Sequence, residues 1–443
     1  MKTKIALFAA VFTTIAAFSQ KQWTLKECVD YALQNNITVK QNRLNVQLAE
    51  KDVEIAKGNF LPDLRGSSSA SFSSGLSPDK LGVLKNTQNF SSNFAFSTRG
   101  TIFNGFQNLN TKKQAQISVD GSKLDLAKIE NDISLNVVNE YLNVLFAKEN
   151  LAVAETQAEI SKKQIERAKA QFEGGAIPKG DLLNVESTAA NDVQSVVLQQ
   201  NRLNLALLRL AQLLQIPSDN FYVADLNIDS PSVALLFDNA DEVYKKALTN
   251  RPEIERAELN VENANLSIEL AKGAYLPSLT YTLGASTSYY HQFNNLLPGQ
   301  TNDNFVSQVN DRVQYNIVLS LDIPIFNRFQ TKNRVAKSII SKENSELSFK
   351  NQQLQLQQEI EGAFLDAKAA AKTFEAAKIS LEAQQEAFKN AQVSYDYGSM
   401  TQFDFDQVRN RLVNAEGAMI RAKYDYVFKT KVLKFYYGES IVE

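Results

Sequence analysis

Two aspartates are the residues of this chain whose type and spacing best fit a function based on charge. The pattern aromatic-x-x-Gly-x-x-x-x-x-Asp occurs twice, first with Gly175 and Asp181 and again with Gly398 and Asp404. Several such carboxylates grouped in a narrow space attract cations. An aspartate just after a turn also favours the start of a helix, by capping backbone N–H groups and by complementing the macrodipole. Both roles stay open for Asp181 and Asp404, and one does not exclude the other.

Other kinds of site have little support in the sequence. The 443 residues include one His and one Cys, which argues against a histidine-based metal or acid–base site and against an intrachain disulfide. No Gly-rich phosphate loop, nucleophile elbow or His/Cys cluster is found. The formal net charge of -2 gives no reason to expect nucleic acid as a partner. We therefore expect no enzyme, no catalytic residue, no metal and no cofactor, and we assign no role to His291, which falls in an expected loop.

The two glycine turns belong to a longer internal repeat. Residues 56–62, AKGNFLP, return as residues 271–277, AKGAYLP, at an offset of 215. Residues 102–106, IFNGF, return as residues 325–329, IFNRF, at an offset of 223, which also relates the two turns. Three landmarks in one order indicate a duplicated unit of about 200 residues, much longer than a solenoid repeat. The extra residues of the second copy must lie between Pro277 and Phe326.

Long helices are predicted on both sides of each turn. Apolar side chains, most of them large, recur every seven residues from Ile360 to Tyr395, and Ala follows three residues after most of them. This pattern is typical of two helices whose backbones approach closely. A three–four alternation of apolar residues also runs through 193–214 and 408–433. The segment 107–172 contains no Pro, and as one helix it would be about 100 Å long.

Two pairs of segments alternate with a period of two instead. Residues 279–289 and 313–325 place apolar side chains on one face and mostly polar ones on the other, and 64–72 and 90–103 repeat the pattern more weakly. Such strands match an outer-membrane barrel, although a half-buried sheet of a soluble protein alternates in the same way. Four strands are too few to close a pore, and open edges in lipid leave backbone groups unsatisfied. The membrane interpretation therefore requires several protomers to close one barrel together.

The N-terminus has the pattern of a secretory signal. Lys2 and Lys4 precede an apolar run from Ile5 to Ala17, and we predict cleavage near Ser19. The expected organisation begins with a signal peptide over 1–19 and a first repeat over 20–216, which contains a helix, strands at about 62–73 and 89–103 and a helical hairpin over 107–216. A linker over 217–241 leads to a second repeat over 242–437, which contains a helix, strands at about 278–290 and 312–326 and a helical hairpin over 330–436. A C-terminal tail over 438–443 completes the chain.

Taken in order, these motifs resemble the TolC-like outer-membrane efflux protein family. The resemblance rests on residues 23–36, WTLKECVDYALQNN, and on their counterpart from Glu242 to Pro252. It also rests on the Leu-Pro entry to each strand pair, the Ile-Phe-Asn-x-Phe exit from each pair and the two turns. Each motif is weak alone. Their doubled order covers nearly the whole mature chain and makes the resemblance specific.

The resemblance implies a mainly α protein with a membrane β-barrel. Each protomer would contribute long α-helical coiled-coil hairpins and four transmembrane strands, and a homotrimer would close a 12-stranded barrel and an α-helical periplasmic tunnel. The implied function is the exit duct of a tripartite efflux pump or type I secretion system in the cell outer membrane, surrounded by outer membrane lipid. Its implied partners are a periplasmic adaptor, or membrane fusion protein, and an inner-membrane transporter. The residues alone leave one alternative, a periplasmic coiled-coil scaffold or adaptor, which does not account for the paired strands.

The resemblance also implies roles for residues at the turns, where members of the family close the tunnel. Tyr395 matches the gate tyrosine and Asp181 its acidic partner. Asp404 matches one position of an acidic ring, in which threefold symmetry would group three carboxylates.

The chain departs from the family pattern at two of these positions. Met400 stands where the gate arginine is expected, and Gln407 stands at the second acidic position, for which Asp406 is the candidate substitute. The tip residues of both turns are candidates for docking the adaptor: Gly175, Ala176, Ile177, Gly398, Ser399 and Met400. The sequence does not indicate whether the cargo is a drug, a metal or a protein.

Overall fold

The structure is a computed structural model that describes residues 21–78, 82–226, 237–294 and 301–441. The expected signal peptide at 1–19 lies outside these ranges, as do parts of the linker and of the C-terminal tail. The chain forms two compact units. Unit 1 takes residues from 1–44, 124–255 and 350–443, and unit 2 comprises 45–123 and 256–349. Each unit contains residues from both sequence repeats, so the two structural units do not coincide with the two repeats.

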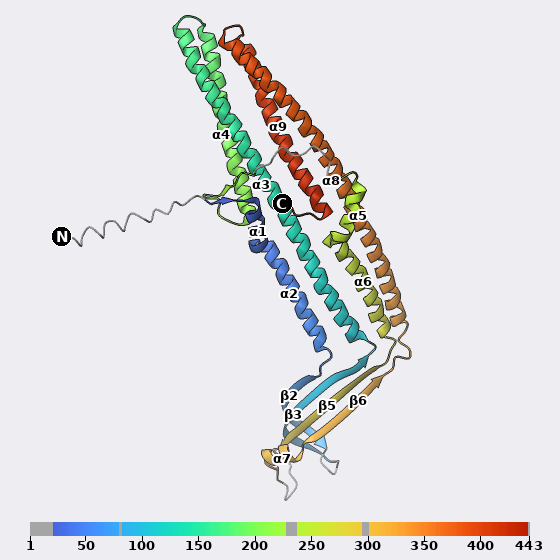
Figure 1. The fold of residues 1–443 in the computed structure, drawn as a ribbon. Helices are drawn as coiled ribbons and strands as arrows, with labels where there is room; N and C mark the ends of the chain where they lie inside the picture. The colour runs from blue at the N-terminus through green and yellow to red at the C-terminus, as the bar shows by residue number, and fades with distance from the viewer. Residues whose placement is uncertain (1–20, 79–81, 227–236, 295–300, 442–443) are drawn as a thin grey trace, which may run out of the picture. The chain divides into compact units, whose positions relative to one another are not determined.

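Long helices make up most of the described chain (Figure 1). The two hairpins are formed by α3 and α4 and by α8 and α9, and α2, α3, α6 and α8 contribute residues to both units. None of the helices in the described ranges is apolar over a sufficient length to span a bilayer. The bounds of the helices and of two short strands are α1 Leu25–Asn35, α2 Ile37–Gly58, α3 Gln107–Glu173, α4 Lys179–Leu214, α5 Ala240–Asn250, α6 Pro252–Gly273, α8 Gln330–Asp396, α9 Gln402–Tyr437, β1 Gln22–Trp23 and β4 Tyr222–Val223.

The core of unit 1 packs α1 against α3, α4 and α9. Cys28 and Leu210 are completely buried in it, and Tyr141 is 1 % exposed. The Tyr141 hydroxyl lies 2.7 Å from the carbonyl oxygen of Ala224 and 3.1 Å from that of Trp23. It therefore ties together the ends of β1 and β4, which pair in parallel.

The two hairpin turns require left-handed backbone at their glycines. Gly175 has φ 73° and Gly398 has φ 76°, a region that side chains with a Cβ rarely adopt. After the first turn, α4 begins behind Pro178, which offers no side-chain cap. After the second, Thr401 caps α9 by accepting the Asp404 backbone N–H at 3.1 Å. The two turns therefore share their reversal chemistry and differ in how the next helix begins.

Unit 2 contains one antiparallel sheet of four strands in the order β2-β3-β5-β6. The strands are β2 Asp63–Pro78, β3 Leu84–Asn104, β5 Ser278–Gln292 and β6 Gln314–Asp322. β2 and β3 run longer than their expected ranges, whereas β6 is shorter than 312–326. It stops ahead of Pro324, which has no N–H to donate to a strand ladder. The segment between the two expected strands of the second repeat contains helix α7, Phe305–Asp311, and His291 lies in β5 rather than in a loop.

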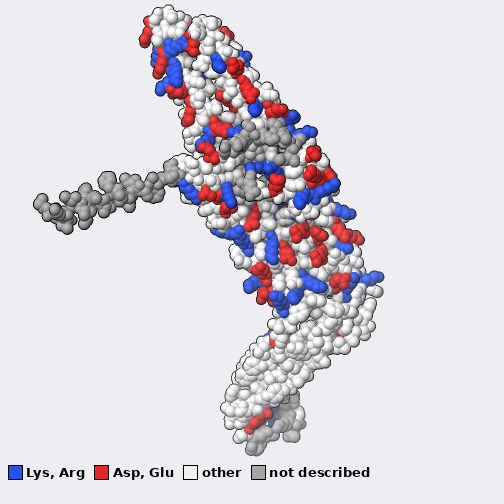
Figure 2. Space-filling view, in the orientation of Figure 1, with Lys and Arg blue, Asp and Glu red and all other residues white. Residues whose placement is uncertain are grey.

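The sheet has one apolar and one polar face. Pairing places Leu283 opposite Ile317 and Tyr281 opposite Leu319, while Gly284 faces Asn316 on the other side. Ile317 is 82 % exposed, so the apolar face is uncovered in a single chain. No Lys, Arg, Asp or Glu occurs in 66–78, 86–98, 278–292 or 314–321. Figure 2 accordingly shows mixed charge over the helices and almost none over the sheet.

Candidate functional site

The candidate residues gather where the two hairpins of unit 1 turn, and Figure 1 shows both turns at the same end of that unit. Four of the six tip residues, Gly175, Ala176, Gly398 and Ser399, are exposed, whereas Ile177 and Met400 are half-buried. Met400 packs against a small apolar cluster formed by Ala391, Phe405 and Val408. The position where an arginine was expected therefore serves as packing in this chain.

Tyr395 lies in the last turn of α8. Its ring stacks on Phe405 of α9 with centroids 4.8 Å apart, and its hydroxyl donates a hydrogen bond to Gln402. Burial raises the pKa of the Tyr395 phenol, so at neutral pH it stays protonated and acts as the donor. Asp181 is exposed in the first turn of α4, and no hydrogen bond or ion pair joins it to Tyr395 in the described chain. The expected pair of Tyr395 and Asp181 is therefore not formed within one protomer.

Asp406 continues the contacts that begin at Tyr395. Gln402 donates from Nε2 to Asp406 Oδ2 at 3.0 Å. The other carboxylate oxygen, Oδ1, lies 3.9 Å from Nε of Arg409, close enough for an ion pair but too far for a hydrogen bond. The Arg409 side chain is 2 % exposed, so α9 carries a buried cation one turn after Asp406.

Arg409 links α9 to the first hairpin. Its Nη1 lies 2.5 Å from Ser161 Oγ in α3 and 3.2 Å from Asp192 Oδ2 in α4. Ser161 in turn donates to the same carboxylate of Asp192. Two aspartates and a serine therefore compensate the buried guanidinium, which would otherwise be costly to remove from water.

Arg167 of α3 makes a second link, at the C-terminal end of α8. It forms an ion pair with the Asp396 carboxylate and donates to the carbonyl oxygens of Tyr395 at 3.3 Å and Asp396 at 3.1 Å. Its guanidinium also lies 4.8 Å from the centre of the Tyr395 ring. The last carbonyls of a helix lack intrahelical partners and carry partial negative charge, so a cation there is stabilising. Tyr395 thus has an arginine beside it, although Met400 occupies the position where one was expected.

These contacts form one continuous set, which we name the polar chain. It joins α3, α4, α8 and α9 through Ser161, Asp192, Arg409, Asp406, Gln402, Tyr395, Arg167 and Asp396. Of the four expected gate residues, Tyr395 and Asp406 belong to it, and Asp181 and Asp404 do not. The polar chain can hold the two hairpins together, and each of its groups can exchange its partner for water.

Asp404 has a helix-capping contact in a single chain. Its carboxylate accepts a hydrogen bond from the Thr401 hydroxyl at 2.7 Å, and its backbone N–H donates to the same hydroxyl. The side chain is otherwise exposed. The capping role is therefore present, and an additional role in an acidic ring depends on neighbouring chains.

Sequence reasoning missed Arg167, Ser161, Asp192 and Arg409. Only one of them left a signal, because Arg409 follows Asp406 at the spacing that places two residues on one helix face. The other three are separated from their partners by between 31 and 248 residues. They occur among many similar polar residues on predicted helices, so their pairing depends on how the hairpins pack.

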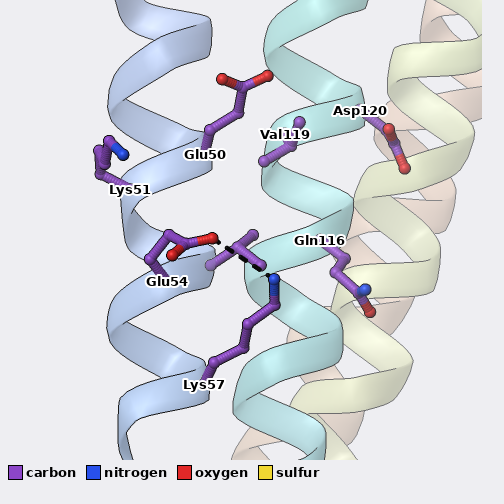
Figure 3. A pocket seen from close by; sticks show the side chains of 8 residues that line it. Glu50, Lys51, Glu54, Lys57, Gln116, Val119 and Asp120 are labelled. Atoms are coloured by element: carbon purple, nitrogen blue, oxygen red, sulfur yellow. Dashed lines mark hydrogen bonds and ion pairs between the residues drawn. The ribbon is translucent and has the colours of Figure 1, made fainter.

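A separate groove of about 430 Å³ lies between α2 and α3 in unit 2 (Figure 3). Glu54 and Lys57, both of α2, form an ion pair along one side of it, at 3.5 Å and with both side chains more than half exposed. Exposed pairs of this kind contribute little binding energy. The described residues also contain no group of three or more His, Cys, Asp or Glu side chains placed to hold a metal ion. We therefore place the candidate site at the polar chain.

Comparisons with known proteins agree with this architecture. The chain is 21% identical over 437 residues to the outer membrane efflux protein BepC of Brucella suis, covering 97% of this chain and 88% of BepC. It is 22% identical over 317 residues to the outer membrane protein TolC of Escherichia coli, covering 69% of this chain and 61% of TolC. The CmeC outer membrane channel of Campylobacter jejuni has the same fold, with a TM-score of 0.75 at 20% identity over 94% of this chain and 87% of that one.

The family assignment follows from a match that covers most of the chain. The model of the family described as "Outer membrane efflux protein" matches residues 28–214 and 243–439, which correspond to the two halves of the duplication. The chain belongs to the outer membrane efflux protein family, whose members are TolC-like channels.

Proposed function

We propose that this protein is the outer-membrane exit duct of a tripartite efflux pump or type I secretion system. Substrates would pass from an inner-membrane transporter and a periplasmic adaptor through the duct to the exterior. Family membership supports this function, and the observation that carries it furthest is the open four-stranded sheet with one apolar and one polar face.

The sheet argues for several protomers around one pore. β2 and β6 are edge strands with no partner strand in the described chain. Unpaired backbone groups in lipid cost several kcal/mol each, so the edges of neighbouring copies would pair and close a barrel. Three copies would give twelve strands, with the apolar face toward lipid and the Ser- and Asn-rich face toward the pore. A helical tunnel in the periplasm would continue the barrel.

The gate of this duct would lie at the hairpin ends. Within each protomer, the polar chain would keep the α8–α9 hairpin against the α3–α4 hairpin. Asp181 and Asp404 are exposed and free to face neighbouring copies, so they would act between protomers, as a partner for the gate and as an acidic ring. The exposed tips, represented by Ser399, would dock the adaptor.

The test of the proposed function is single-channel conductance of the purified full chain in a planar bilayer. We expect small, stable conductance steps from a nearly closed duct, together with heat-resistant trimers recovered from outer-membrane fractions. A soluble periplasmic monomer without conductance, even after Tyr395→Phe and Asp181→Ala are combined, would instead favour the periplasmic scaffold.

Asp404→Ala tests the acidic ring in the same bilayer. Divalent cations added on the periplasmic side should block the parent duct, and the variant should lose about tenfold in block affinity because a ring of carboxylates concentrates cations. Thr401→Ala is the matched control, since it removes the capping contact and keeps the carboxylate. Equal block of parent and Asp404→Ala would leave capping as the sole role of this residue.

Docking at the tips can be tested with a crosslinker attached at Ser399→Cys. We expect a covalent product with the cognate periplasmic adaptor in cells. A cysteine placed at the exposed Lys378 in the same α8–α9 hairpin serves as the control. Absence of product at Ser399→Cys, with the duct still trimeric, would remove this turn from the docking surface.

A further inference from the structure

The outer part of strand β5 is completed by side chains instead of by a strand. β6 pairs with β5 only as far as Ser286, whereas β5 continues to Gln292. Beyond β6, Gln308 of α7 accepts the Tyr290 N–H at 3.0 Å and donates to the Tyr290 carbonyl at 2.9 Å. Asn302 repeats both bonds with Gln292, at 3.1 and 2.8 Å. Two amide side chains therefore take the place of a neighbouring strand.

These bonds fix α7 against the sheet and leave apolar side chains exposed. Gln308 is 2 % exposed, and Asn304 caps the helix by accepting the Ser307 N–H at 2.8 Å. The Phe305 ring lies 5.2 Å from the Tyr289 ring, which belongs to the apolar face of the sheet. Phe305 is nevertheless 48 % exposed and Val306 65 % exposed. α7 therefore extends the apolar face beyond the end of β6.

Further aromatic rings lie beside Tyr289 on the same face. The Phe293 ring lies 5.9 Å from that of Phe72 and 4.7 Å from that of His291. The Tyr289 hydroxyl lies 3.2 Å from Nδ1 of His291. We name this surface the aromatic cap, composed of Phe305 and Val306 of α7 with Phe72, Tyr289, His291 and Phe293. Aromatic side chains with a polar tip are enriched where a membrane meets water.

The position of the aromatic cap along the sheet matches a membrane boundary. Along β6, no charged residue occurs between Arg312 and Asp322. Ten residue steps at about 3.4 Å, tilted by about 45°, span roughly 24 Å, close to the height of the apolar band of outer-membrane barrels. Helix α7 ends at Asp311, immediately before the Arg312 end of this interval, and Ile317 lies at its middle. Figure 2 shows charge returning at the end of the sheet beside α7.

We propose that the aromatic cap is a lipid-contact surface in which α7 sits in the headgroup boundary of the outer leaflet. This inference rests on the proposed location in the outer membrane. Its occupant is bilayer lipid, because the exposed side of α7 is apolar and continues the face of the sheet that Ile317 and Leu319 present. By completing the β5 edge with side chains, Gln308 and Asn302 allow a short helix to lie where a longer β6 would otherwise run.

The chain has a single tryptophan, Trp23, so a tryptophan can be moved into the cap as a probe. In a Trp23→Phe background, Val306→Trp would be reconstituted into phosphatidylcholine vesicles with bromine near the headgroup or near the chain ends. We expect blue-shifted emission and about a twofold loss of intensity with shallow bromines, and a smaller loss with deep ones. Ile317→Trp is the deep control, and Tyr397→Trp, at a residue 87 % exposed in the turn after α8, is the water-exposed control.

Two results would overturn the inference while the proposed function stands. In ducts that conduct, Val306→Trp emission like that of Tyr397→Trp would place α7 in water. If the Val306→Trp emission is protected from an aqueous quencher and is not quenched by either bromolipid, α7 lies against a second copy of the chain. Failure of the same preparation to conduct would instead reject the duct, and the cap with it.

Gln308→Leu tests whether the hydrogen bonds from the Gln308 side chain to β5 hold the aromatic cap in place. Loss of both bonds to Tyr290 should shift the Val306→Trp emission toward that of the water-exposed control, with conductance retained. Gln308→Asn, which keeps the amide, should give an intermediate shift. Unchanged emission in Gln308→Leu would show that the amide does not position the cap and would overturn that part of the inference.

Discussion

Helix α9 packs against two helices of unit 1 through seams that differ in how polar they are. Its seam with α8 is mainly apolar, and within it Phe374 stacks on Tyr426 with centroids 5.8 Å apart among buried alanines. Its seam with α3 also has apolar packing, as between the rings of Tyr424 and Phe146, but it is interrupted by partly or fully buried polar contacts. Arg409 meets Ser161 there, and Glu149 accepts hydrogen bonds from Lys423 and Tyr424 at 2.8 and 2.7 Å.

The difference indicates which seam can open. Apolar surface has no substitute partner in water, so separating α8 from α9 exposes area that costs about 25 cal/mol per Å². Polar groups can exchange their protein partners for water, at a net cost of about 1 kcal/mol for each hydrogen bond. We therefore expect the α8–α9 hairpin to move as one piece against the α3–α4 hairpin.

Phe374→Ala should have the largest effect on stability, because it removes a ring that is 2 % exposed from the apolar seam. The expected loss is about 3–5 kcal/mol in the free energy of unfolding, measured by urea titration at fixed detergent. Phe374→Leu, which keeps most of the volume, should lose about 1 kcal/mol. If both variants lose equally little, the apolar seam is not what holds α8 to α9.

Arg409→Met should cost somewhat less stability but change the gate more. It leaves Asp192 and Asp406 without their buried cation, at about 3 kcal/mol. Because the polar seam is then weakened, the resting conductance of single ducts should rise. Arg411→Met, at an exposed arginine on the same helix, is the matched control. A destabilised duct with unchanged resting conductance would limit Arg409 to a structural role.

Tyr395→Phe should have a smaller effect, since it removes one hydrogen bond, to Gln402, and keeps the ring. We expect a loss of about 1 kcal/mol in stability and a modest rise in resting conductance. Tyr397→Phe, at an exposed tyrosine two residues away, should change neither quantity. Adding Asp181→Ala should raise conductance further only if Asp181 acts between protomers, because it does not meet Tyr395 within one.

Glu416→Gln should give the smallest effect and should depend on pH. Burial raises the pKa of Glu416, while a hydrogen bond from Gln157 on α3 acts in the opposite direction. A carboxyl whose pKa is higher in the folded state opposes folding once it ionises. This cost is absent below the unfolded pKa of about 4.3 and is complete above the folded pKa.

Thermal unfolding of parent and Glu416→Gln at a series of pH values measures this cost. The variant should be slightly more stable at neutral pH and equal to the parent near pH 3, about one unit below the ordinary carboxyl pKa. Glu382→Gln, at an exposed residue of α8, is the control. A constant difference across the whole pH range would show that Glu416 does not titrate in this seam.

The apolar seam could be predicted from sequence and the polar seam could not. The seven-residue repeat from Ile360 to Tyr395 contains Phe374 and the alanines between which it packs. Burial of apolar area is nondirectional, so periodicity alone indicates it. Arg167 and Asp396 are separated by 229 residues and gave no pattern.

The strands show the same division. Alternation predicted all four strands and the two faces of the sheet, because a period of two fixes the face of each side chain. It did not predict α7, whose seven residues are too few for a helical period to emerge. Gln308 and Asn302 gave no signal, since amide side chains that replace a strand look like ordinary loop residues.

By itself, the sequence determined the duplication, the long helices, the strand pairs and the family to which they belong. These features follow from local spacing, and spacing is preserved along the chain whatever the chain packs against. The tertiary structure alone decided that Tyr395 donates a hydrogen bond to Gln402, that Arg167 donates hydrogen bonds to the carbonyl oxygens at the end of α8, and that Arg409 is buried between the hairpins. Hydrogen bonds and ion pairs require atoms within about 3–4 Å and in fixed directions, which only the packing of distant helices provides.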